Sequence, residues 1–187
     1  VMHSLTKYIG GHGTSIGGII VDGGNFDWIK DRKRQPLLNE PDQSYGGAVW
    51  ADAVPQLTGA NIPFVIRLRV VLLRDLGAPL SPFNAFQIIQ GLETVGLRMK
   101  QHCSNAEKVV SFLETQKKVT NVIYPTNHQG EIKERAKKYM QGGYGSLVGM
   151  DVGTKENGAK FIDNLKMLYH VANICLLYTS PSPRDPH

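Results

Sequence analysis

A single amphipathic pattern, which runs from Ser81 to Leu113, constrains the fold of this chain most strongly. Ser81 is a favoured N-cap, and Pro82 fits the first helical position because no backbone N–H is needed there. Apolar residues then recur at steps of three and four, which keeps them on one helix face for about nine turns. They are Phe83, Phe86, Ile89, Leu92, Val95, Met99, Cys103, Ala106, Val110 and Leu113. Helices of this length commonly bridge two lobes, so we expect a domain boundary within the first half.

Two glycines, Gly91 and Gly96, interrupt this helical pattern. Each weakens a helix by about 1 kcal/mol relative to alanine. We therefore expect a bend near them.

The residues before this helix predict mixed secondary structure. The apolar run 16–21, closed by Asp22 and two glycines, predicts a buried strand that ends in a turn. Residues 30–47 carry charges, prolines and glycines without periodicity, so we expect mostly a long loop. Residues 63–76 are ambiguous, because alternation at 66–70 favours a strand whereas Pro63 and Gly77 favour the two ends of a helix.

The residues after the long helix predict an α/β arrangement. The expected elements are a strand at 119–124, a helix at 131–141, a strand at 146–152, a helix at 155–168 and a further strand at 171–174. Glu131 with Arg135, and Glu134 with Lys138, have the i,i+4 spacing that supports the first of these helices. Thr154 is the expected N-cap of the second. Residues 176–187 are rich in proline and have no apolar face, so we expect a disordered, non-native tail.

Composition excludes several classes of protein. The chain has 187 residues, 41% hydrophobic and 20% charged, which is typical of a globular protein. The net charge of +5 comes from scattered basic residues without interleaved aromatics, which argues against nucleic-acid binding. No apolar run approaches the roughly 18 residues that span a membrane. Two cysteines cannot form a disulfide framework and fit a reducing compartment, so we expect a cytoplasmic protein. The chain begins inside an apolar segment, which suggests a fragment.

The candidate functional site lies at Ser4, Thr6 and Lys7, directly before a glycine-rich turn. Two hydroxyls can donate to phosphate oxygens while the lysine amine stays within reach of an aldehyde. The glycines let the backbone turn sharply and approach a ligand closely. The alternative interpretation is structural, because serine and threonine also close turns and lysine is usually a solvated charge.

Other chemistries find no support in the sequence. The glycines at 11, 13 and 17 do not match a dinucleotide-binding fingerprint, because the third comes one position late and no acidic residue follows a βαβ pattern. The six histidines and two cysteines lack metal-ligand spacing, so we expect no metal site. His12 is interpreted as a histidine bonded to backbone. No Gly-x-Ser-x-Gly motif indicates a serine hydrolase.

Several stretches together resemble one enzyme family. They are Ser-Leu-Thr-Lys-Tyr-Ile-Gly-Gly-His at 4–12, Leu-Arg-Asp-Leu-Gly-Ala-Pro-Leu-Ser-Pro-Phe-Asn at 73–84 and Gln-Gly-Leu-Glu-Thr-Val-Gly-Leu-Arg-Met at 90–99. The chain resembles the cysteine/methionine-metabolism family of pyridoxal 5'-phosphate (PLP)-dependent enzymes over about residues 1–174, and within it the O-acetylhomoserine sulfhydrylases (homocysteine synthases). The loop at 40–45 is similar too, with Gly46 where a histidine is more usual.

The resemblance implies a fold class and a domain division. It implies part of an α/β, fold-type-I PLP-dependent transferase, and it favours a helix at 63–76. Residues 1–80 would be the end of the large PLP-binding domain. Residues 81–175 would be the bridging helix and the small α/β domain.

The resemblance also implies chemistry. Lys7 would carry PLP as a Schiff base and act as general acid and base, and Ser4 and Thr6 would hold the cofactor phosphate. The substrates would be O-acetylhomoserine and sulfide or a thiol. O-succinylhomoserine sulfhydrylase, cystathionine γ-synthase and γ-lyase activities remain open, as does a non-catalytic α/β domain.

In this family the ring-stacking aromatic, the acid that pairs with the pyridine nitrogen and the glycine-rich phosphate loop precede the lysine. The substrate-binding arginine lies beyond the divergent tail. The resemblance therefore implies that this chain lacks most of the site, is inactive alone, and belongs to a homotetramer at full length, without nucleic-acid or membrane partners.

Overall fold

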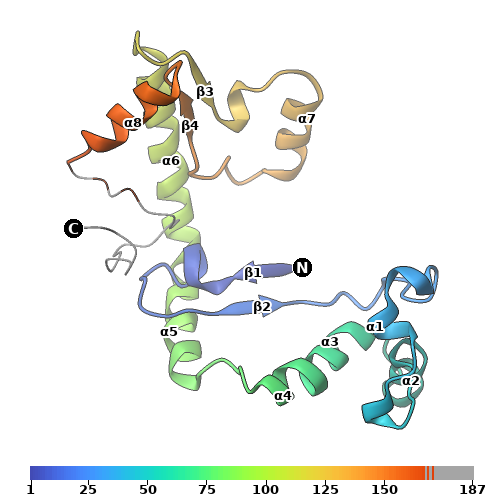
Figure 1. The fold of residues 1–187 in the computed structure, drawn as a ribbon. Helices are drawn as coiled ribbons and strands as arrows, with labels where there is room; N and C mark the ends of the chain where they lie inside the picture. Colours follow the sequence, from blue (N-terminus) through green and yellow to red (C-terminus); the bar gives the residue numbers. More distant parts are fainter. Residues whose placement is uncertain (167, 169, 171–187) are drawn as a thin grey trace. The chain divides into compact units, whose positions relative to one another are not determined.

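The computed structural model describes residues 1–166, 168 and 170, and it divides the chain into two compact units. The first unit consists of Val1–Thr6 and Thr14–Ile88. The second consists of Lys7–Gly13 and the chain from Ile89 onward. The elements of both units are labelled in Figure 1.

The first unit begins with a two-stranded antiparallel ribbon. Strand β1 (Met2–Ser4) pairs with β2 (Gly18–Ile20), so that Ser4 lies opposite Gly18. The strand predicted at 16–21 is therefore formed. The prediction that it is buried is wrong, because Gly18 and Ile19 are exposed. A two-stranded ribbon covers little side-chain surface by itself.

The segment predicted as a long loop contains three short helical elements. They are a 3₁₀ turn at Arg32–Arg34, α1 (Pro36–Asn39) and a second 3₁₀ turn at Gln43–Tyr45. Side chains fix these turns where periodicity is absent. Asp42 accepts hydrogen bonds from the Ser44 backbone at 3.1 Å and from the Trp50 indole at 2.9 Å. Arg32 donates twice to Asp52, at 2.6 and 3.0 Å, and lowers the pKa of that carboxyl group.

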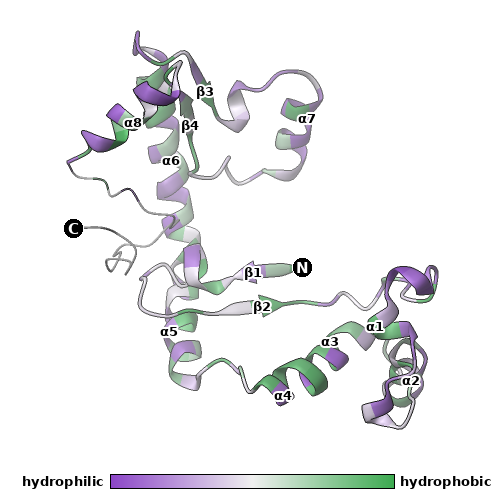
Figure 2. Ribbon diagram, viewed as in Figure 1, coloured by the Kyte–Doolittle hydropathy of each residue, from purple (hydrophilic) through white to green (hydrophobic). Residues whose placement is uncertain are grey.

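The core of the first unit is formed by buried residues of α1 and α2 (Trp50–Thr58). Helix α2 was not predicted from the sequence, and it contains Pro55 in its interior. These core residues pack against a continuous helical stretch made of α3 (Pro63–Arg67), a π-helical turn (Leu68–Leu73) and α4 (Arg74–Leu76). Figure 2 shows the hydrophobic residues along this stretch.

The stretch at 63–76 is a helix, as the resemblance favours. Pro63 occupies the first helical turn, and Gly77 ends the helix in the left-handed conformation at φ 66°. Among the described residues, no single helix is long and apolar enough to cross a membrane. Helix α2 and the stretch Pro63–Leu76, bent by 100°, meet the length and composition criteria only as a pair. Both contribute to the core described above.

The predicted long helix forms as two helices, α5 (Pro82–Glu93) and α6 (Val95–Glu114). The break at Thr94 lies between Gly91 and Gly96, as expected. Burial of the apolar face differs between α5 and α6. In α6, Cys103, Ala106 and Val110 of this face are buried.

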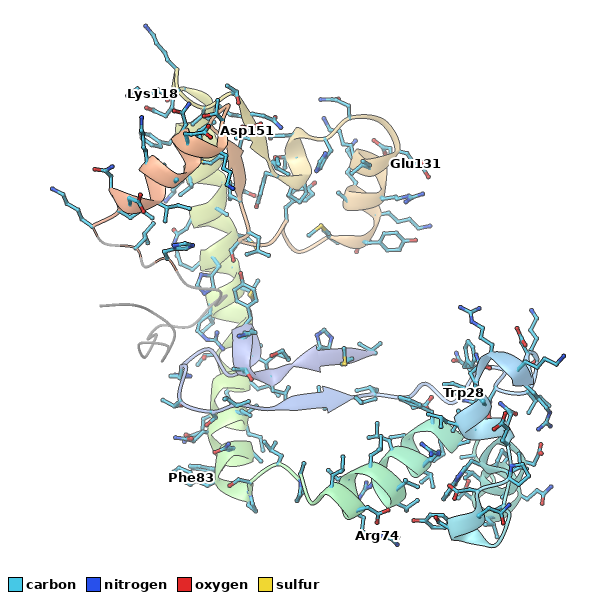
Figure 3. All side chains as sticks on the ribbon, in the orientation of Figure 1. Trp28, Arg74, Phe83, Lys118, Glu131 and Asp151 are labelled. Carbon is cyan, nitrogen blue, oxygen red and sulfur yellow. The ribbon has the colours of Figure 1, made fainter. Side chains whose placement is uncertain are left out.

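Along α5 the same apolar face is exposed. Phe83 is 65% exposed, and the other apolar positions of that face are exposed as well: Phe86, Ile89 and Leu92. Figure 3 labels Phe83 on α5. Ile88 is buried instead, and a Cβ atom built on Gly17 would lie 2.8 Å from it. The buried side of α5 in the first unit is therefore set by its contact with the turn before β2.

The second unit packs a small ribbon on α6. Strand β3 (Asn121–Ile123) pairs antiparallel with β4 (Gly149–Asp151). The core joins Ala106 and Val110 of α6 to Val122 and Tyr124. Tyr124 is 1% exposed, and its hydroxyl donates to the Gly145 carbonyl at 2.9 Å. The two strands predicted here are thus present, though shorter than expected.

Two surface helices complete the described part of the second unit. Helix α7 (Gly130–Tyr139) carries the predicted Glu131–Arg135 pair at 2.5 Å. Glu134 pairs with Lys137 at 2.9 Å rather than with Lys138, since positions three apart are equally close on a helix. Helix α8 (Lys155–Asp163) ends five residues before the predicted Leu168.

The end of α8 has a local cause. The Asn164 side chain donates to the Lys160 carbonyl at 2.7 Å and satisfies one of the terminal acceptors. The strand predicted at 171–174 and the tail at 176–187 lie outside the described residues.

Thr154→Ala tests the predicted cap of α8. The Thr154 hydroxyl accepts a hydrogen bond from the Asn157 backbone at 3.2 Å. Its removal should destabilise the second unit by about 1 kcal/mol, measured by urea denaturation. Thr154→Ser keeps the acceptor and should restore most of that loss. Equal midpoints for Thr154→Ala and the unsubstituted chain would contradict the capping role.

Candidate functional site

The two candidate hydroxyls belong to the first unit and differ in their surroundings. Ser4 is exposed at the end of β1, and its hydroxyl has no hydrogen bond within the part of the chain that the structure describes. The Thr6 hydroxyl donates to the Gly17 carbonyl at 3.2 Å and accepts from the Gly17 N–H at 3.0 Å. Thr6 therefore closes the turn between β1 and β2, as in the structural interpretation of this motif. Ser4 is free to donate elsewhere.

Lys7 begins the segment that belongs to the second unit. Its side chain is half-buried, and its backbone has φ −87° and ψ −125°, which interrupts a short helical turn at Leu5–Ile9. Its carbonyl accepts a hydrogen bond from the Gly11 N–H at 2.7 Å. Within residues 1–166, 168 and 170, the Lys7 amine has no hydrogen-bond or ion-pair partner. Among the described residues, the amine is thus partly accessible and unpaired.

The glycine-rich turn after Lys7 is held by its own backbone. Gly10 and Gly11 are buried, and Gly11 adopts the left-handed conformation at φ 70°. The ring of His12 donates from Nδ1 to the Gly10 carbonyl at 2.6 Å. This confirms that His12 is bonded to backbone.

A basic side chain that the sequence analysis did not single out contacts this turn. Arg98, in the first turn of α6, donates to the carbonyls of Tyr8 at 2.7 Å and Ile9 at 3.1 Å. The Tyr8 hydroxyl bonds to the Ser146 hydroxyl, and its ring lies edge-on to that of His102. No local signal could have revealed these contacts, because Arg98 and Ser146 are about 90 and 140 positions away in sequence.

The chemistry of these groups suits an aldehyde-bearing cofactor with a phosphate. An unpaired, half-buried amine at Lys7 can attach to an aldehyde, and an unoccupied hydroxyl at Ser4 can donate to a phosphate oxygen. The Thr6 hydroxyl would first have to leave Gly17. Within the described residues, no group of three or more His, Cys, Asp or Glu side chains is arranged to hold a metal ion.

Comparison with known proteins decides the family. The model of the family described as Cys/Met metabolism PLP-dependent enzyme matches residues 1–177. The chain belongs to the Cys/Met metabolism PLP-dependent enzyme family. This confirms the predicted family and, with the solved structures below, the predicted α/β fold class of a fold-type-I PLP-dependent transferase.

Curated relatives in this family are sulfhydrylases and homocysteine synthases. The chain is 46% identical over 179 residues to the O-acetyl-L-homoserine sulfhydrylase of Leptospira meyeri, covering 93% of this chain and 40% of the relative. It is 41% identical over 175 residues to the homocysteine synthase of Schizosaccharomyces pombe, with the same coverage. The chain therefore spans about two-fifths of the length of these relatives.

Solved structures of the family share the fold. The putative O-acetylhomoserine (thiol)-lyase of Campylobacter jejuni, which contains a pyridoxyl-lysine phosphate, has a TM-score of 0.73 and 34% identity. The match covers 93% of this chain and 42% of that one. Cystathionine gamma-lyase of Lactobacillus plantarum has a TM-score of 0.65 at 22% identity over 95% of this chain and 36% of that one, a similarity of fold alone.

Proposed function

We propose that the chain is part of a PLP-dependent enzyme that converts O-acetylhomoserine and sulfide into homocysteine and acetate. In this γ-replacement the bond between Cγ and the acetyl oxygen breaks and a bond between Cγ and sulfur forms. The observation that carries the proposal is the 46% identity to an O-acetyl-L-homoserine sulfhydrylase over 93% of this chain. The family match over residues 1–177 includes Lys7. The unpaired amine of Lys7 supports it.

Three residues of this chain have separate proposed roles. Lys7 is the proposed point of covalent attachment and the group that moves protons at the substrate Cα and Cβ. Ser4 would donate to the cofactor phosphate. Thr6 would join it only by exchanging its hydrogen bond with Gly17. PLP, when bound, supplies the electron sink for carbanionic chemistry next to the substrate amine.

The proposal extends to the full-length protein. We infer a cytoplasmic homo-oligomer that acts in methionine biosynthesis. The family resemblance implies that this oligomer is a homotetramer. Cys103, which is buried and unpaired, is consistent with a reducing compartment.

A chimeric enzyme tests the substrate. In it, residues 1–174 of this chain replace the matched segment of the Leptospira meyeri sulfhydrylase. We expect homocysteine from O-acetylhomoserine and sulfide, detected as a free thiol by mass spectrometry. Homocysteine from O-succinylhomoserine alone would identify the succinyl-specific relative. Cystathionine from cysteine, or 2-oxobutanoate without sulfur incorporation, would identify a γ-synthase or γ-lyase instead.

The 187-residue chain by itself should be inactive and bind PLP weakly at best. Transition-state stabilisation depends on a complete set of groups around the cofactor, and the chain spans only about two-fifths of its relatives. Turnover of O-acetylhomoserine by the isolated chain, together with a borohydride-reducible adduct at Lys7, would contradict this expectation.

A further inference from the structure

We propose that Arg98 is a positioning residue for Lys7, which it holds by binding the backbone that follows this lysine. The inference rests on the proposed function of Lys7 as the attachment point. Both residues belong to the second unit, Lys7 in its amino-terminal segment and Arg98 in the first turn of α6.

The guanidinium group of Arg98 uses several of its donors on fixed acceptors. Nη1 donates to the Tyr8 carbonyl at 2.7 Å, and Nη2 donates to the Ile9 carbonyl at 3.1 Å. Nη2 also donates to the Gly91 carbonyl at 2.7 Å, and Nε to the Thr94 hydroxyl at 3.1 Å. Because the guanidinium is planar and rigid, these contacts fix the Lys7 segment relative to the helix break.

The break between α5 and α6 provides one of these acceptors. The Gly91 carbonyl lies in the last turn of α5, where it accepts long hydrogen bonds from the backbone and hydroxyl of Thr94, both at 3.3 Å. Arg98 donates to the same carbonyl at a shorter distance. A cation at the carboxyl end of a helix also interacts favourably with the helix dipole.

Two glycines make room for this arrangement. A Cβ atom built on Gly11 would lie 2.3 Å from Nη1 of Arg98 and 2.6 Å from its Cζ. A Cβ atom built on Gly91 would lie 2.1 Å from the Gly10 carbonyl oxygen. The turn after Lys7 therefore packs its backbone directly on the guanidinium and on the end of α5.

These contacts restrain the carboxyl-terminal side of Lys7 at three consecutive carbonyls. The Lys7 carbonyl is bound by the Gly11 N–H, and those of Tyr8 and Ile9 are bound by Arg98. The direction in which a side chain leaves the backbone follows from its backbone conformation. Arg98 thus acts on the lysine through the peptide chain, without a role in proton transfer.

Hydrogen exchange in the 187-residue chain tests the structural half of the proposal. In Arg98→Met, the Gly11 amide, which donates to the Lys7 carbonyl, should exchange about tenfold faster by NMR. Arg98→Lys keeps the positive charge but loses the planar set of guanidinium donors. Its Gly11 amide should exchange at a rate between those of the unsubstituted chain and Arg98→Met. Arg135→Met, which removes an exposed arginine of α7, is the matched control and should leave this amide unchanged. Unchanged exchange in Arg98→Met would overturn the proposal.

A double-mutant cycle tests whether Arg98 acts through Lys7. In the chimeric enzyme described above, the PLP dissociation constant is measured for the parent, Arg98→Met, Lys7→Ala and the double variant. If Arg98 positions Lys7, Arg98→Met should weaken binding about tenfold in the parent and have almost no effect once Lys7 is absent. A role in general stability would give the same loss in both backgrounds and would overturn the proposal.

The two claims fail in different ways. Lys7→Ala with unchanged PLP affinity would refute the proposed function. If Lys7→Ala weakens PLP binding and Arg98→Met weakens it equally with and without Lys7, only the positioning role would be refuted.

Discussion

Gly91→Ala should destabilise the second unit by about 3 kcal/mol, although alanine is the better helix former. The new methyl group would lie 2.1 Å from the carbonyl oxygen, 2.7 Å from the carbonyl carbon and 2.8 Å from the Cα atom of Gly10. All three are backbone atoms, so no side-chain rotation relieves the overlap. The turn after Lys7 would have to move away from α5, and the hydrogen bonds that Arg98 makes to both would be lost with it.

Gly96→Ala is the matched control for this prediction. Gly96 lies in the first turn of α6, and a Cβ atom built there meets no atom within 4 Å. Alanine at this position should raise stability by about 0.5–1 kcal/mol through helix propensity alone. Urea denaturation followed by circular dichroism measures both variants. Equal stabilisation by the two substitutions would contradict the close approach of Gly10 to Gly91.

Lys7→Ala in the chimeric enzyme should reduce homocysteine formation by at least about 10³-fold. The substitution removes both the proposed attachment point and the group proposed to move protons at Cα and Cβ. The covalently bound fraction of PLP should fall to zero. Turnover is measured with O-acetylhomoserine and sulfide at saturating PLP, so that weak cofactor binding does not account for the loss.

Lys100→Ala controls for the removal of a lysine elsewhere in the second unit. Lys100 is exposed on α6, and its loss should leave turnover and bound PLP unchanged. Lys7→Arg keeps the positive charge but cannot attach to an aldehyde, and it should be as inactive as Lys7→Ala. Substantial turnover by Lys7→Arg would show that the charge, rather than the primary amine, is what the site requires.

The sequence predicted elements well where local signals agree. Ser81 precedes α5, which begins at Pro82, and Thr154 caps α8. At 63–76 the local signals conflict, and the resemblance favoured the helix that forms. Burial could not be predicted where neighbours distant in sequence decide it, as at the strand predicted to be buried at 16–21. The apolar face of α5 is a clear pattern, yet Phe83 is exposed and Ile88 is buried instead. Periodicity describes which residues share a face but not which face is covered.

The candidate site was located by sequence, whereas its restraints were not. Lys7 and the hydroxyls of Ser4 and Thr6 form a recognisable motif within four positions. The engagement of the Thr6 hydroxyl by Gly17 and the contacts of Arg98 with Tyr8 and Ile9 depend on residues far apart in the chain. Gly91 was expected to weaken the helix and to favour a bend. Its close approach to Gly10 gives it a packing role that helix propensity does not reveal.

Peptide mapping of the borohydride-reduced chimeric enzyme tests the central claim most directly. Reduction converts the attached cofactor into a stable pyridoxyl-lysine, which mass spectrometry locates within a proteolytic peptide. The proposal predicts the modification on Lys7, in the peptide that contains Ser4 and Thr6, at close to one per chain. Modification spread over other lysines, with Lys7 unmodified in an enzyme that turns over O-acetylhomoserine, would contradict it.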